Sequence, residues 1–266
     1  MNSLKSDVKE KYMKLYGDFQ KEDWLKVLGI PEKNIPSSFI IHGEWVLEDN
    51  LSLWREILCN EALVPKWNTL VGKYNNLNIG YANVYGSSMA SNIVHQFACS
   101  GTEIFIQTGY FGGLSSEVRY GDILIVTSAE MKDGVSQWYL PEQIVVESNK
   151  ELVEAACNYC EEKGYRYVKG TVVSMSAMLL ETHEMVKEWA LKGHDGVDME
   201  TATTLAIAHK FNKKAIGLLN LSDHIINGDT LYSYTRDREL IEAETDKAIR
   251  DIALYLSEKF KGRQTI

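Results

Sequence analysis

Polar and glycine-rich segments follow four short apolar runs of this sequence, and a fifth segment carries two acids. The four segments are HGEW (42–45), YGSSMAS (85–91), QTGYFGGL (107–114) and NLSDHIINGD (220–229), and the fifth is VDMET (197–201). A carboxylic acid such as Asp223 can protonate a leaving group, and a carboxylate such as Glu200 can accept hydrogen bonds from two vicinal hydroxyls. Each residue also has a purely structural interpretation. Asp223 is typical of an Asx turn, and Glu200 is typical of the first turn of a helix.

Common nucleotide-binding, hydrolase and metal motifs are missing from these segments. The sequence has no GxxxxGKS/T, GxGxxG, GxSxG, HExxH or EF-hand loop, and its six histidines are dispersed. Cys157 and Cys160 form a CxxC inside a charged helical pattern, which favours a structural role over a redox or zinc site. We therefore expect neither a metal nor a cofactor.

The composition restricts the class of partner. The chain has 266 residues, with 28 Lys plus Arg against 37 Asp plus Glu and a formal net charge of −9. An acidic chain without a basic block is not expected to bind nucleic acid or an anionic membrane. No apolar run reaches membrane-spanning length, and the charged N-terminus is unlike a secretory signal, so we expect a cytoplasmic protein.

The elements that position these segments alternate along the chain. Short apolar runs predict strands at 38–43, 76–86, 103–109, 122–131, 167–176 and 214–222. Amphipathic patterns predict helices within 3–29 and at 91–101, 149–164, 198–212 and 238–260. This alternation predicts a single-domain, three-layer α/β fold with a central mixed sheet and a ligand at the carboxyl ends of its strands. Residues 1–37 would form a helical extension to a catalytic domain at 38–260.

Three ordered segments resemble a known family. They are QTGYFGGLSSEVRYGDILIVTSAEMKDG (107–134), GVDMETATTLAIAHKF (196–211) and GLLNLSDHIINGD (217–229). Together they resemble the nucleoside phosphorylase/nucleosidase superfamily, which contains purine and uridine phosphorylases and methylthioadenosine/adenosylhomocysteine nucleosidases. The resemblance spans about residues 38–258. It implies a sheet that partly curls into a barrel, a small-molecule nucleoside substrate, and a homo-oligomer (dimer, trimer or hexamer).

The resemblance also assigns the sugar and base contacts. VDMET is similar to the family's V-E-M-E segment, which implies that Glu200 holds the ribose hydroxyls and that Met199 packs under the sugar. Met178 falls where the family stacks an apolar side chain on the base. Ser222 and Asp223 form the S-D pair of the purine branch, so the implied substrate is a purine nucleoside.

In that branch the aspartate protonates N7 of the departing base, a role that falls here to Asp223. Cleavage of the glycosidic bond leaves negative charge on the purine, and a carboxylic acid at N7 therefore lowers the barrier. Thirteen residues later, Arg236 falls where purine phosphorylases have an arginine that moves onto this aspartate.

The acceptor site departs from the phosphorylase pattern. Leu47 replaces the arginine of the G-D-P-x-R loop, of which Glu44 retains the acid. In the R-x-G-S/T segment, Gln107 replaces the arginine and Tyr110 the small hydroxyl residue, while Gly109 is retained. Charge-assisted hydrogen bonds to phosphate are strong, so losing two arginines should weaken phosphate binding severely.

These departures leave three functions open. Water is favoured as the acceptor, with Glu44 or Glu48 to activate it, which would make the protein a nucleosidase. The alternative within the same class is a phosphate-using purine nucleoside phosphorylase. The alternative of another class is an inactive nucleoside-binding protein.

Overall fold

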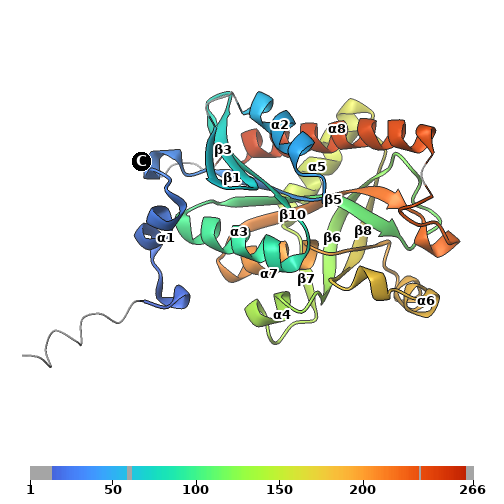
Figure 1. Ribbon diagram of the computed structural model, residues 1–266. Helices are drawn as coiled ribbons and strands as arrows, with labels where there is room; N and C mark the ends of the chain where they lie inside the picture. The colour runs from blue at the N-terminus through green and yellow to red at the C-terminus, as the bar shows by residue number, and fades with distance from the viewer. Residues whose placement is uncertain (1–13, 59–61, 234, 262–266) are drawn as a thin grey trace, which may run out of the picture.

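A mixed β-sheet runs through the middle of the protein, with helices on both of its faces (Figure 1). The computed structural model describes residues 14–58, 62–233 and 235–261. The strands are β1 (Ser38–Gly43), β2 (Leu63–Lys66), β3 (Thr69–Tyr74), β4 (Leu77–Val84), β5 (Ile104–Gly113), β6 (Ile123–Lys132), β7 (Val145–Glu147), β8 (Tyr167–Met175), β9 (Gly196–Asp198) and β10 (Lys214–Asp223). The helices are α1 (Lys21–Leu28), α2 (Glu48–Ile57), α3 (Ser87–Ser100), α4 (Ser136–Tyr139), α5 (Lys150–Lys163), α6 (His183–Leu191), α7 (Thr201–Lys210) and α8 (Arg236–Lys259).

Part of the sheet closes on itself. Strand β5 pairs in parallel with β10, β10 pairs antiparallel with β6, and β6 pairs in parallel with β8. Strand β9 then joins β8 back to β5, which completes the circuit. Four further strands extend from β5 as an open sheet in the order β1, β4, β3 and β2, and β7 pairs antiparallel with β6. The prediction of a mixed, partly barrel-like sheet is confirmed.

Alternating side chains of the strands build two core layers. In β1, Phe39 and Ile41 belong to the core that contains α3 and α7, whereas Ile40 belongs to the core that contains α2, α5 and α8. This alternation follows from the two-residue period of a strand. Figure 1 shows α2 and α8 together on one side of the sheet, with α3 and α7 on the other. Both sides are therefore covered, as expected of strands with continuous apolar runs.

Six predicted strands correspond to β1, β4, β5, β6, β8 and β10, and the four later predicted helices correspond to α3, α5, α7 and α8. The hairpin of β2 and β3, the short strands β7 and β9, and helix α6 were not predicted. Of the helix expected within residues 3–29, the part before residue 14 lies outside the described residues, and α1 forms the end. Trp24 and Leu28 of α1 are buried against the domain.

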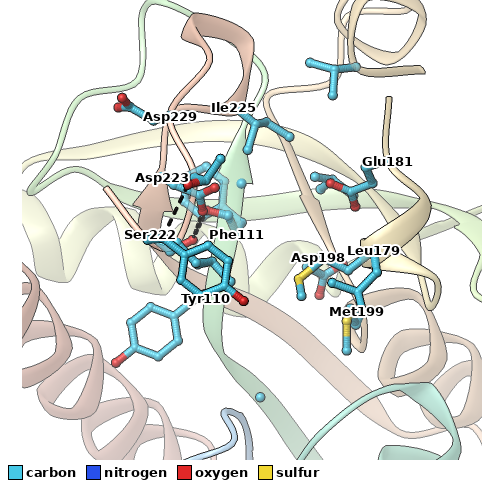
Figure 2. A pocket seen from close by; sticks show the side chains of 18 of the residues that line it. Tyr110, Phe111, Leu179, Glu181, Asp198, Met199, Ser222, Asp223, Ile225 and Asp229 are labelled. Atoms are coloured by element: carbon cyan, nitrogen blue, oxygen red, sulfur yellow. Dashed lines mark hydrogen bonds between the residues drawn. The ribbon is translucent and has the colours of Figure 1, made fainter. Parts of the chain in front are cut away.

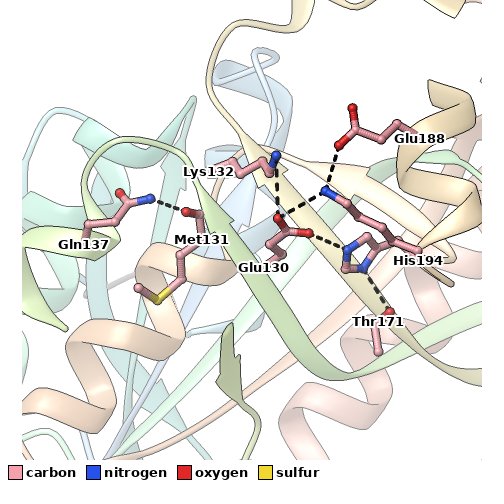
Figure 3. A network of polar contacts seen from close by, with 8 residues as sticks. Glu130, Met131, Lys132, Gln137, Thr171, Glu188 and His194 are labelled. Carbon is pink, nitrogen blue, oxygen red and sulfur yellow. Dashed lines mark hydrogen bonds and ion pairs between the residues drawn. The ribbon is translucent and has the colours of Figure 1, made fainter. Parts of the chain in front are cut away.

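A polar network ties the end of β6 to the segment before β9 (Figure 3). His194 Nε2 lies 2.7 Å from Glu130 Oε2, and His194 Nδ1 lies 3.1 Å from Thr171 Oγ1. Lys132 and Lys192 approach the other oxygen of Glu130 at 3.6 and 3.9 Å. None of these residues lines the cavity described below, so we assign the network a structural role.

In the described part of the chain, no helix has the length and apolarity needed to cross a membrane.

Candidate active site

A cavity of about 610 Å³ opens where the strands of the sheet end. Its walls come from the segments that follow β1, β4, β8 and β9, from the last residues of β5 and β10, and from the start of α6. Carboxyl ends of strands are the usual ligand site of open α/β sheets, and the cavity lies within the size range of small-molecule sites. The location of the ligand that the sequence predicts thus coincides with this cavity.

Asp223 lies at the end of β10 and is only 5% exposed. Ser222 Oγ lies 2.5 Å from Asp223 Oδ1, to which it can donate, and 3.1 Å from the carbonyl oxygen of Phe111. Figure 2 shows this pair on one side of the cavity. Burial raises the pKa of Asp223, which favours the protonated form that a general acid requires.

Glu200 lies just after β9, at the N-cap of α7, and is also 5% exposed. Its Oε1 accepts a 2.5 Å hydrogen bond from the backbone N–H of Gly86. Its Oε2 would lie 2.6 Å from a Cβ placed on Gly43, so any larger residue there would displace the Glu200 carboxyl group. Burial, and then the nearby charge of Asp198, raise the pKa of Glu200 to about 8.

The raised pKa of Glu200 predicts how stability depends on pH. Because the folded-state pKa lies above the ordinary 4.5, this group favours the folded state fully only at low pH, and the contribution is lost as pH rises through about 8. We expect the wild-type Tm to fall between about pH 5 and pH 9, and Glu200→Gln to reduce that slope. Calorimetry at several pH values measures this dependence of Tm on pH. Glu48→Gln, at an exposed position, is the control. Equal slopes for wild type and Glu200→Gln would contradict the assignment.

Glu44, rather than Glu48, reaches the cavity from the end of β1. Its Oε1 accepts hydrogen bonds from the backbone N–H groups of Trp45 and Val46, at 2.7 and 3.1 Å. Burial raises the pKa of Glu44. Glu48 is exposed in the first turn of α2 and lies outside the cavity wall.

The other three predicted acceptor-site residues have different surroundings. Gln107 is fully buried; its amide accepts from Thr204 Oγ1 at 2.6 Å and donates to the carbonyl of Thr108 at 2.9 Å. Gly109 has φ = +136°, and a Cβ there would lie 2.6 Å from the backbone oxygen of Gly43. Tyr110 lines the cavity, but its hydroxyl donates to Asp246 of α8 at 2.6 Å. Of the four positions, Glu44 and Tyr110 line the cavity, while Gln107 and Gly109 lie behind its wall.

A different arginine from the expected one lies beside Asp223. Arg236 is exposed at the first position of α8. Arg238 instead donates to the backbone carbonyl of Ser222 and lies over the ring of Tyr120, 4.4 Å from its centroid. Its charge favours the ionised form of Asp223 and so opposes the rise in the pKa of that carboxyl.

We expect Arg238→Gln to lower kcat/KM by about 10-fold and Arg236→Gln by less than about 2-fold, because only Arg238 positions the segment carrying Asp223. Steady-state kinetics with a purine nucleoside compare the two variants. A positioning role for Arg238 also predicts that the pH dependence of kcat/KM shifts relative to wild type in Arg238→Gln but not in Arg236→Gln. The opposite ranking would support the role that the sequence predicts for Arg236.

The predicted packing groups both line the cavity, together with an acid that was not predicted. Met199 follows β9, and Met178 begins a short 3₁₀ helix after β8. Glu181 follows that helix, and Figure 2 shows it across the cavity from Asp223. Burial, with the charge of Asp223, raises the pKa of Glu181 to about 7. Glu181 is separated from the end of β8 by the apolar 3₁₀ helix Met178–Leu180, so residue spacing could not identify it.

The cavity wall is acidic. Six of its residues are acids, and none of the described lining residues is Lys or Arg. The acids are Glu44, Glu181, Asp198, Glu200, Asp223 and Asp229. Such a wall favours a neutral or cationic species over a phosphate dianion. Among the described residues, no group of His, Cys, Asp and Glu has an arrangement that could hold a metal ion.

A cavity with buried carboxyl groups at the carboxyl edge of a mixed sheet is thus the main feature of this α/β fold. The chain belongs to the phosphorylase superfamily, whose sequence model matches residues 56–258.

Individual relatives support the same assignment. The chain is 29% identical over 154 residues to a DeoD-type purine nucleoside phosphorylase of Bacillus cereus, and 31% identical over 130 residues to one of Clostridium beijerinckii. These matches cover 56% and 48% of this chain. They cover 66% and 55% of the relatives, so the chain spans about half to two thirds of the length of the curated relatives it matches.

Solved structures share the fold. Uridine phosphorylase from Vibrio fischeri superposes with a TM-score of 0.76 at 19% identity, over 87% of this chain and 96% of that one. A methylthioadenosine/adenosylhomocysteine nucleosidase from Campylobacter jejuni gives a TM-score of 0.71 at 16% identity, over 85% of this chain and 100% of that one.

Proposed function

We propose that this protein cleaves the N-glycosidic bond of a purine nucleoside and that water accepts the sugar. Family membership and the named purine nucleoside phosphorylase relatives support the bond and the substrate class. The choice of water rests on one observation. The described cavity wall carries six acids and neither Lys nor Arg, whereas a phosphate dianion needs cationic or other strong donors.

The proposed reaction uses three carboxyl groups. The C1′–N9 bond breaks with its electron pair moving to the purine, and protonated Asp223 donates its proton to N7. Glu200 accepts hydrogen bonds from the ribose hydroxyls, and ionised Glu44 stabilises the positive charge that develops on the sugar. The oxygen of water bonds to C1′, and Glu44 accepts the proton that water loses. Free ribose and the neutral base leave.

A base-release assay tests the proposal. Adenosine, inosine, guanosine and methylthioadenosine are each incubated with the protein, with and without phosphate. We expect release of base from at least one of them, at the same rate in both buffers. Release that requires phosphate would overturn the choice of water and favour phosphorolysis, the second candidate, which the named relatives support. Tight nucleoside binding without release would favour the inactive binding protein.

We also propose that the catalytic domain covers residues 38–260 and that it functions as a homo-oligomer. Large apolar side chains remain exposed at the mouth of the cavity, namely Leu179 at 88% and Tyr232 at 92%. Covering such side chains is a common reason for association. Light scattering measures the oligomeric state, and a monomer at all concentrations would contradict this part of the proposal.

A further inference from the structure

A second cavity, of about 290 Å³, lies between the sheet and helices α2 and α8. It shares no lining residue with the cavity of the candidate active site. Alternation along β1 and β5 explains its position. His42 and Thr108 follow Ile40 and Ile106 by two residues and therefore face the same side of the sheet, toward α8.

Arg250 of α8 is the cation of this cavity. Its guanidinium forms no hydrogen bond or ion pair with another residue in the described ranges, although the carboxylate of Asp246 lines the same space. Asp246 accepts instead from Tyr110 at 2.6 Å and from Asn220 at 2.8 Å. A half-buried guanidinium therefore lines a cavity without a hydrogen-bonded acceptor from the described residues, an arrangement that a bound anion would complete.

A neutral histidine supplies a further polar group. His42 Nδ1 lies 3.0 Å from Thr108 Oγ1. Burial, together with the charge of Arg250, lowers the pKa of His42 to about 4, so its ring is neutral at pH 7. In the tautomer with hydrogen on Nε2, Thr108 donates to Nδ1, and Nε2 can donate to a ligand.

Apart from Asn50, whose amide donates to the carbonyl of Val46 and to Asn83 Oδ1, the rest of the wall is apolar. It includes Trp54, whose ring stacks on Tyr81 with 4.6 Å between centroids, and the buried side chains of Ile40 and Ile249. An apolar cavity well below this size can hold a single aromatic ring. The wall thus offers room for a small apolar body next to one cationic group.

We propose that this second cavity binds a small monocarboxylate, with its carboxylate on Arg250 and its apolar body against Trp54. One guanidinium beside one carboxylate gives the cavity no excess positive charge, so a dianion such as phosphate is disfavoured. The apolar wall favours an aliphatic or aromatic body over a purely polar anion. This site is independent of the proposed nucleoside chemistry.

Benzoate tests this proposal, with benzamide as its neutral analogue and inorganic phosphate as the dianion. Calorimetric titration of the intact protein gives the stoichiometry and Kd. We expect one benzoate per chain, and benzamide and phosphate at least about 10-fold weaker. Arg250→Gln should weaken benzoate binding by at least about 10-fold, whereas Arg55→Gln, which removes an exposed arginine from α2, should leave it unchanged.

Three results would overturn the proposal. They are the absence of saturable benzoate binding to the wild-type protein, equal affinities for benzoate and benzamide, and unchanged benzoate affinity in Arg250→Gln. The comparison of benzoate with benzamide uses the wild-type protein, so the test remains decisive even where Arg250→Gln does not fold. Benzoate binding that persists in Arg250→Gln would place the ligand elsewhere on the protein.

Discussion

Replacing Asp223 with asparagine is expected to lower kcat/KM for a purine nucleoside by about 10²-fold or more. The amide keeps the size of the side chain and can still form a hydrogen bond with Ser222, but it has no acidic proton to give to N7. Because burial already raises the pKa of Asp223, the wild-type group is well suited to remain protonated while substrate binds. Steady-state base release measures the loss.

The pH profile separates this role from a structural one. In the wild type, kcat/KM should fall as pH rises through the pKa of the acid, and Asp223→Asn should lose that limb. Asp229→Asn is the matched control, since Asp229 lines the same cavity and is held by Tyr120 at 2.9 Å. An Asp223→Asn variant with wild-type turnover would remove this residue from the mechanism.

Replacing Glu200 with alanine is expected to lower kcat/KM for a ribonucleoside by about 10²-fold, because the sugar then loses the buried carboxyl group that accepts from its hydroxyls. A comparison of substrates with and without the ribose hydroxyls is more diagnostic than the fall in kcat/KM itself. Wild-type protein should prefer inosine over 2′,3′-dideoxyinosine, and Glu200→Ala should nearly abolish that preference.

Glu48→Gln, on the exposed start of α2, serves as the control for this substrate series. A Glu200→Ala variant that keeps the full preference for inosine would show that another group holds the ribose. Equal losses for inosine and its dideoxy analogue would indicate a general disturbance of the cavity and would contradict the specific contact.

The sequence predicted most of the elements that carry this site, because buried strands have continuous apolar runs and short polar exits. The exits of β1, β5 and β10, with Asp223 among them, therefore lie together as expected. The hairpin of β2 and β3 was not predicted because its strands are short and irregular in burial.

The direction of individual side chains was the main feature of the site that the sequence did not predict. Alternation along β5 sends Gln107 toward α7 and Tyr110 toward α8, so neighbours in one motif have unrelated surroundings. The family resemblance also favoured Arg236, whereas the first turn of α8 directs Arg238 toward Ser222. These outcomes depend on the packing of helices against the sheet, which the local pattern does not encode.

Oxygen-18-labelled water offers the most direct test of the central claim, that water accepts the sugar of a purine nucleoside. The protein is incubated with its best nucleoside substrate in labelled water containing phosphate, and the sugar product is analysed by mass spectrometry immediately after a single turnover. We predict free ribose that carries one labelled oxygen at C1. Unlabelled ribose 1-phosphate as the product would contradict the claim and identify phosphate as the acceptor.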